Sequence, residues 1–264
     1  MKIAVSQLIA GPMPMVELAD KAKAAGFDGV ELHLSSARQE LNYDTTDSEI
    51  ADIRKTFAER SLELFSVTVT GKSGNLLDCG EAANDAIGQA VFGLEAASKL
   101  GAKVILHTLG KLSPELYYED AFNNAIANLK VIAKSAEKIG VTLAVEFVWN
   151  GFLFSPLEMR GLLEAVGSDR IGFYFDPGNM AVFQYPQHWV RALGKHTKHV
   201  HLKDWKGGAL KGEWTALLQG AVDFPTVMRE LRAAGYAGPL VSEVAPSLAS
   251  WEDTAKAMRQ IAEM

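Results

Sequence analysis

The sequence contains one cysteine in 264 residues, and this scarcity excludes a scaffold held together by disulfides. Cys79 has no second cysteine to pair with, and it cannot by itself anchor a thiolate-rich metal site. Proline and glycine number only 9 and 23, which excludes a collagen-like or linker-rich chain. Hydrophobic residues make up 48% of the chain, so intrinsic disorder is excluded and a folded globular protein is predicted.

A basic surplus and a long apolar run are also missing. The chain has 26 Lys and Arg against 32 Asp and Glu, so its net charge of −6 argues against a nucleic-acid partner. No run approaches the roughly 18 apolar residues that span a bilayer, so no membrane association is expected. Ser6 and Gln7 interrupt the short apolar start, which predicts a first strand in place of a signal peptide. We therefore expect a cytoplasmic protein.

Short β-branched runs alternate along the chain with longer stretches of helical periodicity, which is the pattern of a parallel sheet built from βα units. Several helical stretches, including residues 15–25, 116–139 and 226–234, are followed by a glycine suited to a left-handed cap. No glycine-rich phosphate loop follows the first run, which disfavours a doubly wound sheet. We predict a single (β/α)8 barrel domain over residues 1–264, with its active site at the carboxyl ends of the strands. The predicted strands are residues 2–6, 29–34, 62–68, 103–108, 141–147, 171–176, 199–204 and 239–244.

Polar residues occur inside several predicted strands, although strands buried on both faces are usually almost wholly apolar. In residues 30–34 (VELHL) the apolar residues occupy one parity, while Glu31 and His33 occupy the other. Because side chains alternate faces with period two, the second parity faces the barrel interior. Burying an unpaired carboxylate costs several kcal/mol, so repetition of this split on five strands indicates a functional site. The polar residues on the later strands are Glu146, Asp176, His201, Lys203 and Glu243.

A divalent metal ion would make four of these groups compatible. The carboxylates of Glu146, Asp176 and Glu243 would repel one another in a low-dielectric barrel mouth unless a cation lay between them. Three carboxylate oxygens and the imidazole nitrogen of His201, with no thiolate, suit Mn²⁺, Mg²⁺ or Co²⁺ better than a structural zinc. We therefore predict one bound divalent ion, with Zn²⁺ as an alternative.

Four motifs resemble the xylose-isomerase-like TIM-barrel superfamily, which contains sugar and sugar-phosphate isomerases and epimerases. They are residues 144–146 (AVE), 175–179 (FDPGN), 199–204 (HVHLKD) and 220–224 (GAVDF), which follow one another in the family order. The resemblance implies that Glu146, Asp176, His201 and Glu243 bind one metal ion. It also implies that Glu146 and Glu243 act as acid and base on opposite faces of the substrate. A metal that holds a carbonyl and its neighbouring hydroxyl favours loss of the α-proton and formation of an enediolate.

Three positions depart from the ketohexose 3-epimerases of this superfamily. Where those enzymes carry Glu, His and Arg, this sequence has Phe152, Asn179 and Gly207. The sequence therefore does not identify which sugar is the substrate. Residues 201–204 (HLKD) are also similar to inosose dehydratases, so a lyase acting on a keto-inositol or keto-sugar is an alternative. A hydroxypyruvate-isomerase-like enzyme and a non-catalytic sugar-binding protein are further alternatives. An apurinic endonuclease is disfavoured, because the chain is acidic and has only six histidines.

Other side chains are expected to bind a small carbohydrate substrate. Lys203 shares the parity of His201 and is expected to hold a carboxylate, a phosphate or a developing oxyanion. The same parity argument places His107, at the end of the fourth strand, at the mouth of the barrel and predicts that it contacts substrate. Trp149, Phe152 and Trp205 are candidates for packing against a sugar ring, and residues 206–212 predict a mobile lid. The predicted substrate-binding residues are Glu31, His33, His107, Trp149, Asn179 and Lys203. A homo-oligomer is expected from the superfamily.

Overall fold

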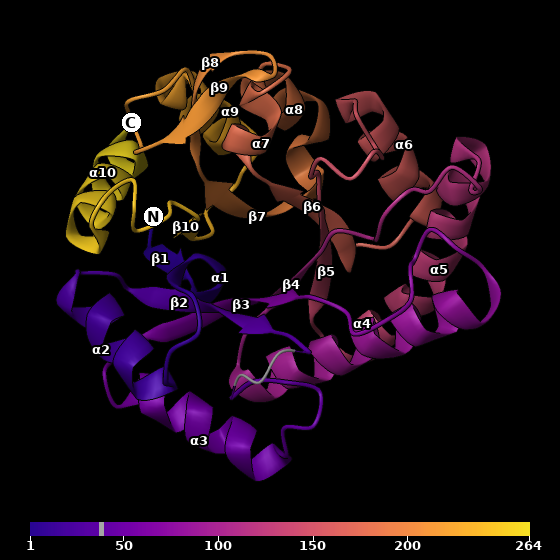
Figure 1. Cartoon of the computed structure of the whole chain (residues 1–264), viewed down its shortest axis with the longest axis horizontal. Helices are drawn as coiled ribbons and strands as arrows, with labels where there is room; N and C mark the ends of the chain where they lie inside the picture. Colours follow the sequence, from indigo (N-terminus) through magenta and orange to yellow (C-terminus); the bar gives the residue numbers. More distant parts are fainter. Residues whose placement is uncertain (37–39) are drawn as a thin grey trace.

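The strands of the protein close into one parallel barrel (Figure 1). The computed structural model describes residues 1–36 and 40–264. The strand order around the barrel is β1-β10-β7-β6-β5-β4-β3-β2, so the predicted (β/α)8 architecture is confirmed. Each of the eight strands begins and ends within two residues of its predicted bounds. The barrel strands are β1 (Ile3–Ser6), β2 (Gly29–Leu34), β3 (Glu63–Val69), β4 (Val104–His107), β5 (Thr142–Glu146), β6 (Ile171–Phe175), β7 (Thr197–Leu202) and β10 (Leu240–Ser242).

Helices surround the barrel and cover the outer face of its strands (Figure 1). The long helices α4 and α5 end on Gly101 and Gly140, whose φ angles of 87° and 83° are left-handed, and the cap at Gly140 follows the helical stretch predicted for residues 116–139. The last predicted helix, residues 226–234, begins earlier than expected because the Asp223 side chain accepts from the backbone N–H of Thr226. The helices are α1 (Gln7–Ala10), α2 (Met15–Ala24), α3 (Asp47–Ala58), α4 (Gly80–Leu100), α5 (Tyr118–Ile139), α6 (Pro156–Val166), α7 (Pro177–Ala181), α8 (Pro186–Leu193), α9 (Phe224–Ala233) and α10 (Trp251–Glu263), with a 3-10 turn at Gly194–His196.

An antiparallel hairpin, β8 (Asp204–Gly208) and β9 (Lys211–Thr215), projects from the end of β7. Residues 206–212, which were predicted to form a mobile lid, lie in this hairpin, and their movement as a lid stays a prediction. The hairpin itself was not predicted because its two-residue turn is formed by Ala209 and Leu210, which lack the Asn-Gly signal of tight hairpins. Leu210 adopts a left-handed φ of 56° there. Trp205 and Trp214 are paired across the hairpin.

The strand register shows which side chains enter the barrel and corrects the position of His107. Glu31 is paired with Ser66, and Thr68 is paired with Leu106, so these side chains share the interior face. His107 follows Leu106 directly and therefore has the opposite parity. The parity argument for His107 was wrong.

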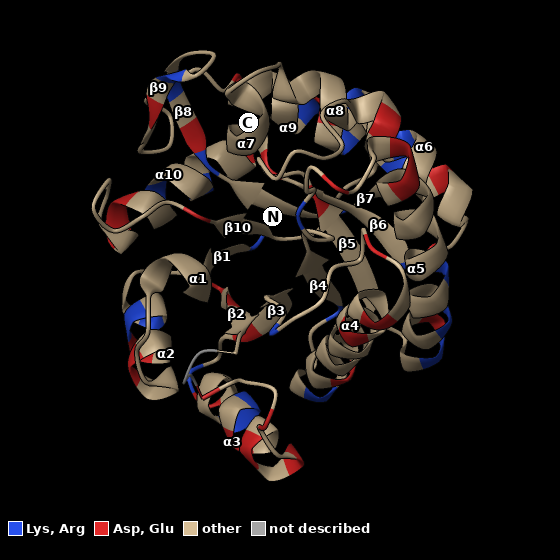
Figure 2. Cartoon of the chain, turned by 45° about the vertical axis from the view of Figure 1, so that its right-hand side comes forward, with Lys and Arg blue, Asp and Glu red and all other residues tan. Residues whose placement is uncertain are grey.

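Charged residues are most frequent on the outer helices, while the strands are mainly uncharged (Figure 2). The main core lies between strands and helices, and a small separate cluster of Val104, Leu106, Ala144 and Tyr174 fills the barrel interior. Among the described residues, no helix combines the length and the apolarity needed to traverse a bilayer.

Asp28 joins the first strand to the last helix. Its carboxylate accepts a hydrogen bond from Ile3 N at 2.8 Å and two from the guanidinium of Arg259 at 2.7 and 2.8 Å. Burial raises the pKa of Asp28, but the hydrogen bonds from Arg259 and Ile3 outweigh it, so the net pKa is lowered. The ionised form is therefore favoured by folding.

We expect Asp28→Asn to lower the free energy of unfolding by about 1 kcal/mol at pH 7, because this ion pair is bidentate but partly solvated. Because the folded pKa lies below the unfolded one, the contribution is complete above the ordinary Asp pKa of about 4 and is lost as the pH falls through the folded value. Urea unfolding of both proteins between pH 3 and pH 7 measures this. The control is Asp44→Asn, which breaks an exposed pair with Lys72 and should change nothing. A wild-type advantage that persists undiminished at low pH would contradict the assignment.

Candidate metal centre

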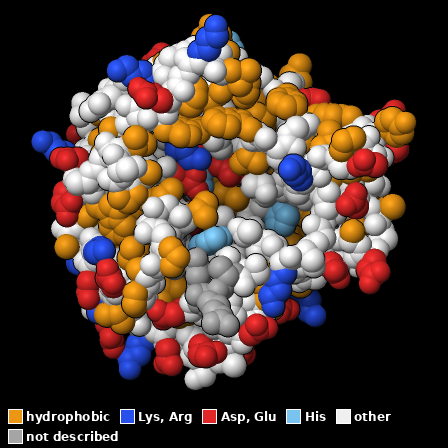
Figure 3. Space-filling view, viewed as in Figure 1, with side chains coloured by type: hydrophobic (Ala, Val, Ile, Leu, Met, Phe, Trp, Pro, Cys, Tyr) orange, Lys and Arg blue, Asp and Glu red, His pale blue; other side chains and the backbone are white. Residues whose placement is uncertain are grey.

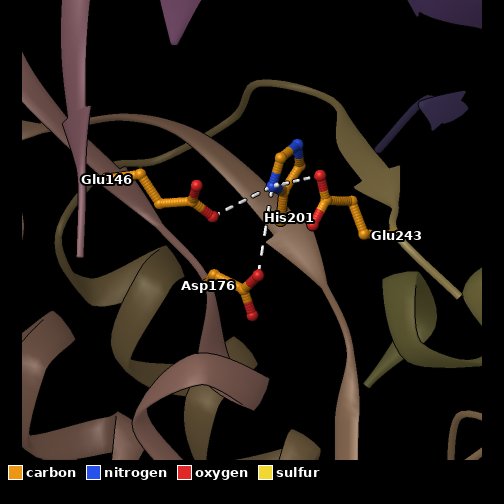
Figure 4. Close-up of side chains that lie close together, drawn as sticks. All are labelled: Glu146, Asp176, His201 and Glu243. Atoms are coloured by element: carbon orange, nitrogen blue, oxygen red, sulfur yellow. Dashed lines mark hydrogen bonds and ion pairs between the residues drawn. The ribbon is translucent and has the colours of Figure 1, made fainter. Parts of the chain in front are cut away.

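Four side chains with metal-binding atoms meet at the carboxyl end of the barrel (Figure 4). Glu146 ends β5, Asp176 follows β6, His201 lies in β7 and Glu243 follows β10. One ligand atom from each lies within 4.8 Å of the other three. His201 Nδ1 is 3.2 Å from Glu146 Oε1, 3.7 Å from Glu243 Oε1 and 4.0 Å from Asp176 Oδ2. The structure thus brings together the four residues that the sequence predicted as ligands.

The turn from β6 into α7 fixes the direction of Asp176. Its Oδ1 accepts from the backbone N–H groups of Gly178 at 2.9 Å and Asn179 at 3.2 Å, which caps the helix and leaves Oδ2 for the cluster. Pro177 occupies the first helical turn, where its missing N–H has no cost. A Cβ at Gly178 would collide with the side chain of Lys203, so only glycine allows this close approach. The FDPGN motif therefore shapes the site through the backbone.

Glu31 lies beneath the cluster and is fully buried, so the prediction that it contacts substrate needs correction. Its Oε1 is 2.8 Å from His201 Nε2, and its Oε2 accepts from Tyr174 at 2.5 Å and Ser66 at 2.7 Å. A carboxylate that accepts Nε2–H turns Nδ1 of the imidazole toward the cluster, where a bound cation would replace the Nδ1 proton. Parity showed that Glu31 points inward, but it could not show that the residue lies one layer below the barrel mouth.

The electrostatics of the cluster are dominated by burial and by close carboxylates. Burial raises the pKa of Glu146 to about 7, against the opposing effect of His201. Burial lowers the pKa of His201, but Glu243 and Glu31 more than reverse this, so its pKa is well above the usual value. Lys203 Nζ lies 2.5 Å from Glu243 Oε2 and 3.0 Å from Asp176 Oδ2, and the pKa of this ammonium is raised although burial opposes it. The carboxylates therefore attract cations strongly.

The donor set fits a divalent ion. Ligand atoms about 2.1 Å from a common Mn²⁺ or Mg²⁺ lie about 3.0 Å apart at right angles and about 4.2 Å apart across the ion, and the separations of 3.2, 3.7 and 4.0 Å around His201 Nδ1 fall within this range. Asp176 Oδ2 is buried and makes no well-directed hydrogen bond, although Lys203 is near it. A buried carboxylate oxygen without a directed donor is suited to metal ligation. These four residues can hold the ion. The carboxylate of Glu31 is not one of them, and it orients His201 by accepting a hydrogen bond from Nε2.

A cavity of about 410 Å³ opens beside the cluster and is lined by Glu146, Glu243 and Lys203 together with residues of the loops after β3 and β4. In the space-filling view, acidic and cationic side chains lie at the bottom of a central hollow with histidines at its edge (Figure 3). His107 lines this cavity, although its strand parity differs from the prediction. The volume is sufficient for a small polar ligand.

Two other predicted substrate-binding residues, His33 and Asn179, form hydrogen bonds to neighbouring residues of the protein. His33 is buried, and its Nε2 is 2.9 Å from Thr70 Oγ1. Asn179 donates to Glu146 Oε1 at 3.3 Å and to Phe147 O at 3.1 Å, so it orients the Glu146 carboxylate. These contacts show how the two side chains are held, while their binding of substrate stays a prediction.

The three aromatic residues predicted to pack against a sugar lie in different environments, and the role of Trp149 stays a prediction. Trp149 is half-exposed and stacks on Trp214 with ring centroids 5.2 Å apart. Phe152 is buried against Tyr118, so the expectation that it packs on a sugar is wrong. Trp205 is also buried and lies edge-on to Trp214.

Three residues near the site were not singled out from the sequence. Ser66 and Tyr174 bind Glu31, and the alternation along their strands already placed Tyr174 on the interior face. The centre of the Trp214 ring lies 5.4 Å from Lys203 Nζ. The only sequence signal for this position is the pair of tryptophans that flank a glycine-containing run, which form a cross-strand pair in the hairpin.

Comparisons with known proteins agree with this architecture. The chain is 25% identical over 179 residues to a probable L-ribulose-5-phosphate 3-epimerase UlaE of Mycoplasma pneumoniae, a match covering 66% of this chain and 58% of that protein. The L-ribulose-5-phosphate 3-epimerase UlaE of Salmonella paratyphi C is 24% identical over 248 residues, covering 89% of this chain and 81% of that protein.

Solved structures share the fold over the whole chain. A D-psicose 3-epimerase crystallised in the presence of D-fructose superposes with a TM-score of 0.81 at 17% identity and covers 100% of both chains. The IOLI protein with a bound zinc atom gives a TM-score of 0.79 at 16% identity and covers 99% of this chain and 96% of that one. A family model for the xylose isomerase-like TIM barrel matches residues 19–261. The chain therefore belongs to the xylose isomerase-like TIM-barrel family.

Proposed function

We propose that this protein is a divalent-metal-dependent isomerase or epimerase acting on a small sugar or sugar phosphate in the cytoplasm. The observation that carries the proposal is the convergence of Glu146, Asp176, His201 and Glu243 beside a cavity of about 410 Å³. The sugar epimerases among its relatives support this reaction class. The donor set favours Mn²⁺, Mg²⁺ or Co²⁺, and the zinc atom in the IOLI structure keeps Zn²⁺ as an alternative.

Glu146 and Glu243 are the proposed acid–base pair. They extend toward each other from opposite sides of the cluster, so a substrate carbon between them would present one face to each carboxylate (Figure 4). A bound divalent ion supplies charge stabilisation at the substrate's carbonyl and adjacent hydroxyl. One glutamate removes the proton beside the carbonyl, and the other delivers a proton to the opposite face or to the neighbouring carbon. Asn179 holds the Glu146 carboxylate in place during this exchange.

Dehydration of a keto-inositol or keto-sugar is the second candidate. Lys203 Nζ contacts Glu243 Oε2 at 2.5 Å, so an acid lies next to a proposed base. An ammonium in that position is suited to donate a hydrogen bond to a departing hydroxyl and to stabilise its negative charge after the α-proton has been removed. This step would yield an unsaturated product and one water, whereas isomerisation retains every atom.

Incubation in D₂O with a panel of ketoses tests the proposal. With Mn²⁺, Co²⁺ or Mg²⁺ added, we expect deuterium at the carbon next to the carbonyl, seen by NMR and mass spectrometry, with no loss of water. An unsaturated product would support the dehydratase, and neither outcome with any ketose or keto-inositol would contradict both. Heat-denatured protein with the same ion is the control for metal-catalysed exchange.

A further inference from the structure

A second cavity, of about 240 Å³, lies next to the first cavity, the one of about 410 Å³ that opens beside the cluster. Glu243 and Lys203 line both cavities and form an ion pair, so this pair is the border between them. The rest of the second cavity is formed by α1, by the hairpin β8–β9 and by the segment that follows β10. A substrate whose reacting carbon lies at Glu243 can therefore extend into either cavity.

The wall of the second cavity is mainly apolar and is accessible. Ile9, Trp214 and Ala245 are partly exposed, and Leu248 is 38% exposed. Together with the buried Val244 they are the apolar residues of the lining. In the space-filling view, hydrophobic side chains border the central hollow around its charged floor (Figure 3). An apolar group bound in the second cavity would remove exposed apolar surface from water, which is favourable.

The polar residues of the second cavity are largely engaged within the protein. The Asp204 carboxylate accepts hydrogen bonds from three backbone N–H groups, at 3.0, 2.9 and 3.2 Å. Lys203 and Glu243 bind each other. Thr215 contributes the remaining polar side chain of the lining. A charged group placed in this cavity would therefore lose water and gain few hydrogen bonds.

The first cavity has a different chemistry. Besides Glu146, its lining includes the polar side chains of Lys72, Asn75 and His107, so it suits the part of a sugar that carries hydroxyl groups. The second cavity suits an apolar group of limited size. An apolar cavity of about 150 Å³ holds benzene, so one of about 240 Å³ has room for a phenyl ring.

From this geometry we infer that the second cavity is a substrate subsite that binds an apolar substituent of about the size of a phenyl ring. The substrate is then a sugar derivative with its hydroxyl-bearing part in the first cavity and its apolar part in the second. The inference rests on the proposed function and narrows its substrate class. It assigns Ile9, Trp214 and Leu248 a role in recognition and none in proton transfer.

Binding of glycosides tests this without depending on turnover, because a phenyl and a methyl glycoside share the sugar and differ only in the substituent. Calorimetry on the Mn²⁺-loaded protein compares the phenyl and methyl forms of β-D-glucopyranoside, β-D-galactopyranoside and α-D-mannopyranoside. At least one phenyl glycoside should bind the wild type about tenfold more tightly than its methyl partner.

Leu248→Asn tests the apolar wall directly. The amide has nearly the size of the leucine side chain but is polar, so the preference for the phenyl glycoside should fall at least about threefold, while the affinity for the methyl glycoside stays within about twofold. Leu248→Met keeps the wall apolar and should retain the preference to within about twofold.

Leu157→Asn is the matched control. Leu157 is an exposed leucine of α6 that lines neither cavity, so this variant should keep the full preference. All three variants should melt close to the wild-type temperature, because both leucines are already exposed to solvent.

Several results would overturn the inference. They are a preference for phenyl below about fivefold in every glycoside pair, an unchanged preference in Leu248→Asn, and an equal loss in Leu157→Asn. Phenol binding as tightly as the phenyl glycosides would also overturn it, because the sugar would then add nothing to binding. The D₂O assay on the wild type reports separately on the proposed function, so either conclusion can fail while the other stands.

Discussion

Glu243→Gln is expected to reduce deuterium exchange into substrate by about 10²- to 10⁴-fold, the usual contribution of a positioned acid or base. The amide keeps the size and one oxygen of Glu243 but cannot accept a proton. Lys203 loses its charged partner at 2.5 Å and keeps Asp176 at 3.0 Å, so the fold should persist. Exchange rates at saturating Mn²⁺, with circular dichroism and melting as checks of folding, measure the effect.

Glu243 is also a proposed ligand, so the acid–base role needs a comparison that separates it from metal binding. Asp176→Asn alters a ligand that has no proposed proton-transfer role, and its backbone caps hold the side chain in place. Excess Mn²⁺ should restore much of the activity of Asp176→Asn and little of that of Glu243→Gln. Glu146→Gln should behave like Glu243→Gln. Equal restoration of all three variants would refute the acid–base assignment.

The barrel and the convergence of four side chains with metal-binding atoms were predictable because both depend on side-chain alternation, which is a local property of strands. Polar residues of one parity on several strands must meet inside a closed barrel, and Glu146, Asp176, His201 and Glu243 do so. Their spacing along the chain carries no further information, since the barrel closure brings them together. This part of the site needed no knowledge of packing.

Side-chain alternation could not predict how deep a side chain lies in the barrel or where a side chain at the end of a strand points. Parity shows the face on which Glu31 lies, but the stagger between strands places it below His201, where it binds the ring. His107 lines the cavity from the opposite parity, because the chain turns after β4 at the left-handed Leu109. The hairpin after β7 was missed because its turn lacks a recognisable sequence. These features depend on tertiary geometry that the local pattern does not encode.

Removing the metal should abolish exchange and lower the melting temperature. The cluster holds three buried carboxylates within 4.8 Å, so a bound ion relieves their repulsion and stabilises the folded state. An ion at 100 times its Kd contributes about 2.7 kcal/mol, which corresponds to about 5–10 °C in a chain of this size. Elemental analysis should find one ion per chain, and dialysis against EDTA followed by Mn²⁺, Co²⁺, Mg²⁺ or Zn²⁺ should identify which restores both properties.

Glu31→Gln tests the metal site through the residue that orients His201. Glu31 accepts the Nε2–H of His201 and touches no proposed ligand atom, so its loss should weaken metal affinity by about 10- to 100-fold without removing a ligand. Ser66→Ala, which removes one of the three hydrogen bonds to Glu31, should have a smaller effect. Calorimetric titration of the EDTA-treated proteins measures both. A wild-type chain that binds none of the four ions would contradict the metal site, whereas unchanged affinity in Glu31→Gln would contradict only the support assigned to Glu31.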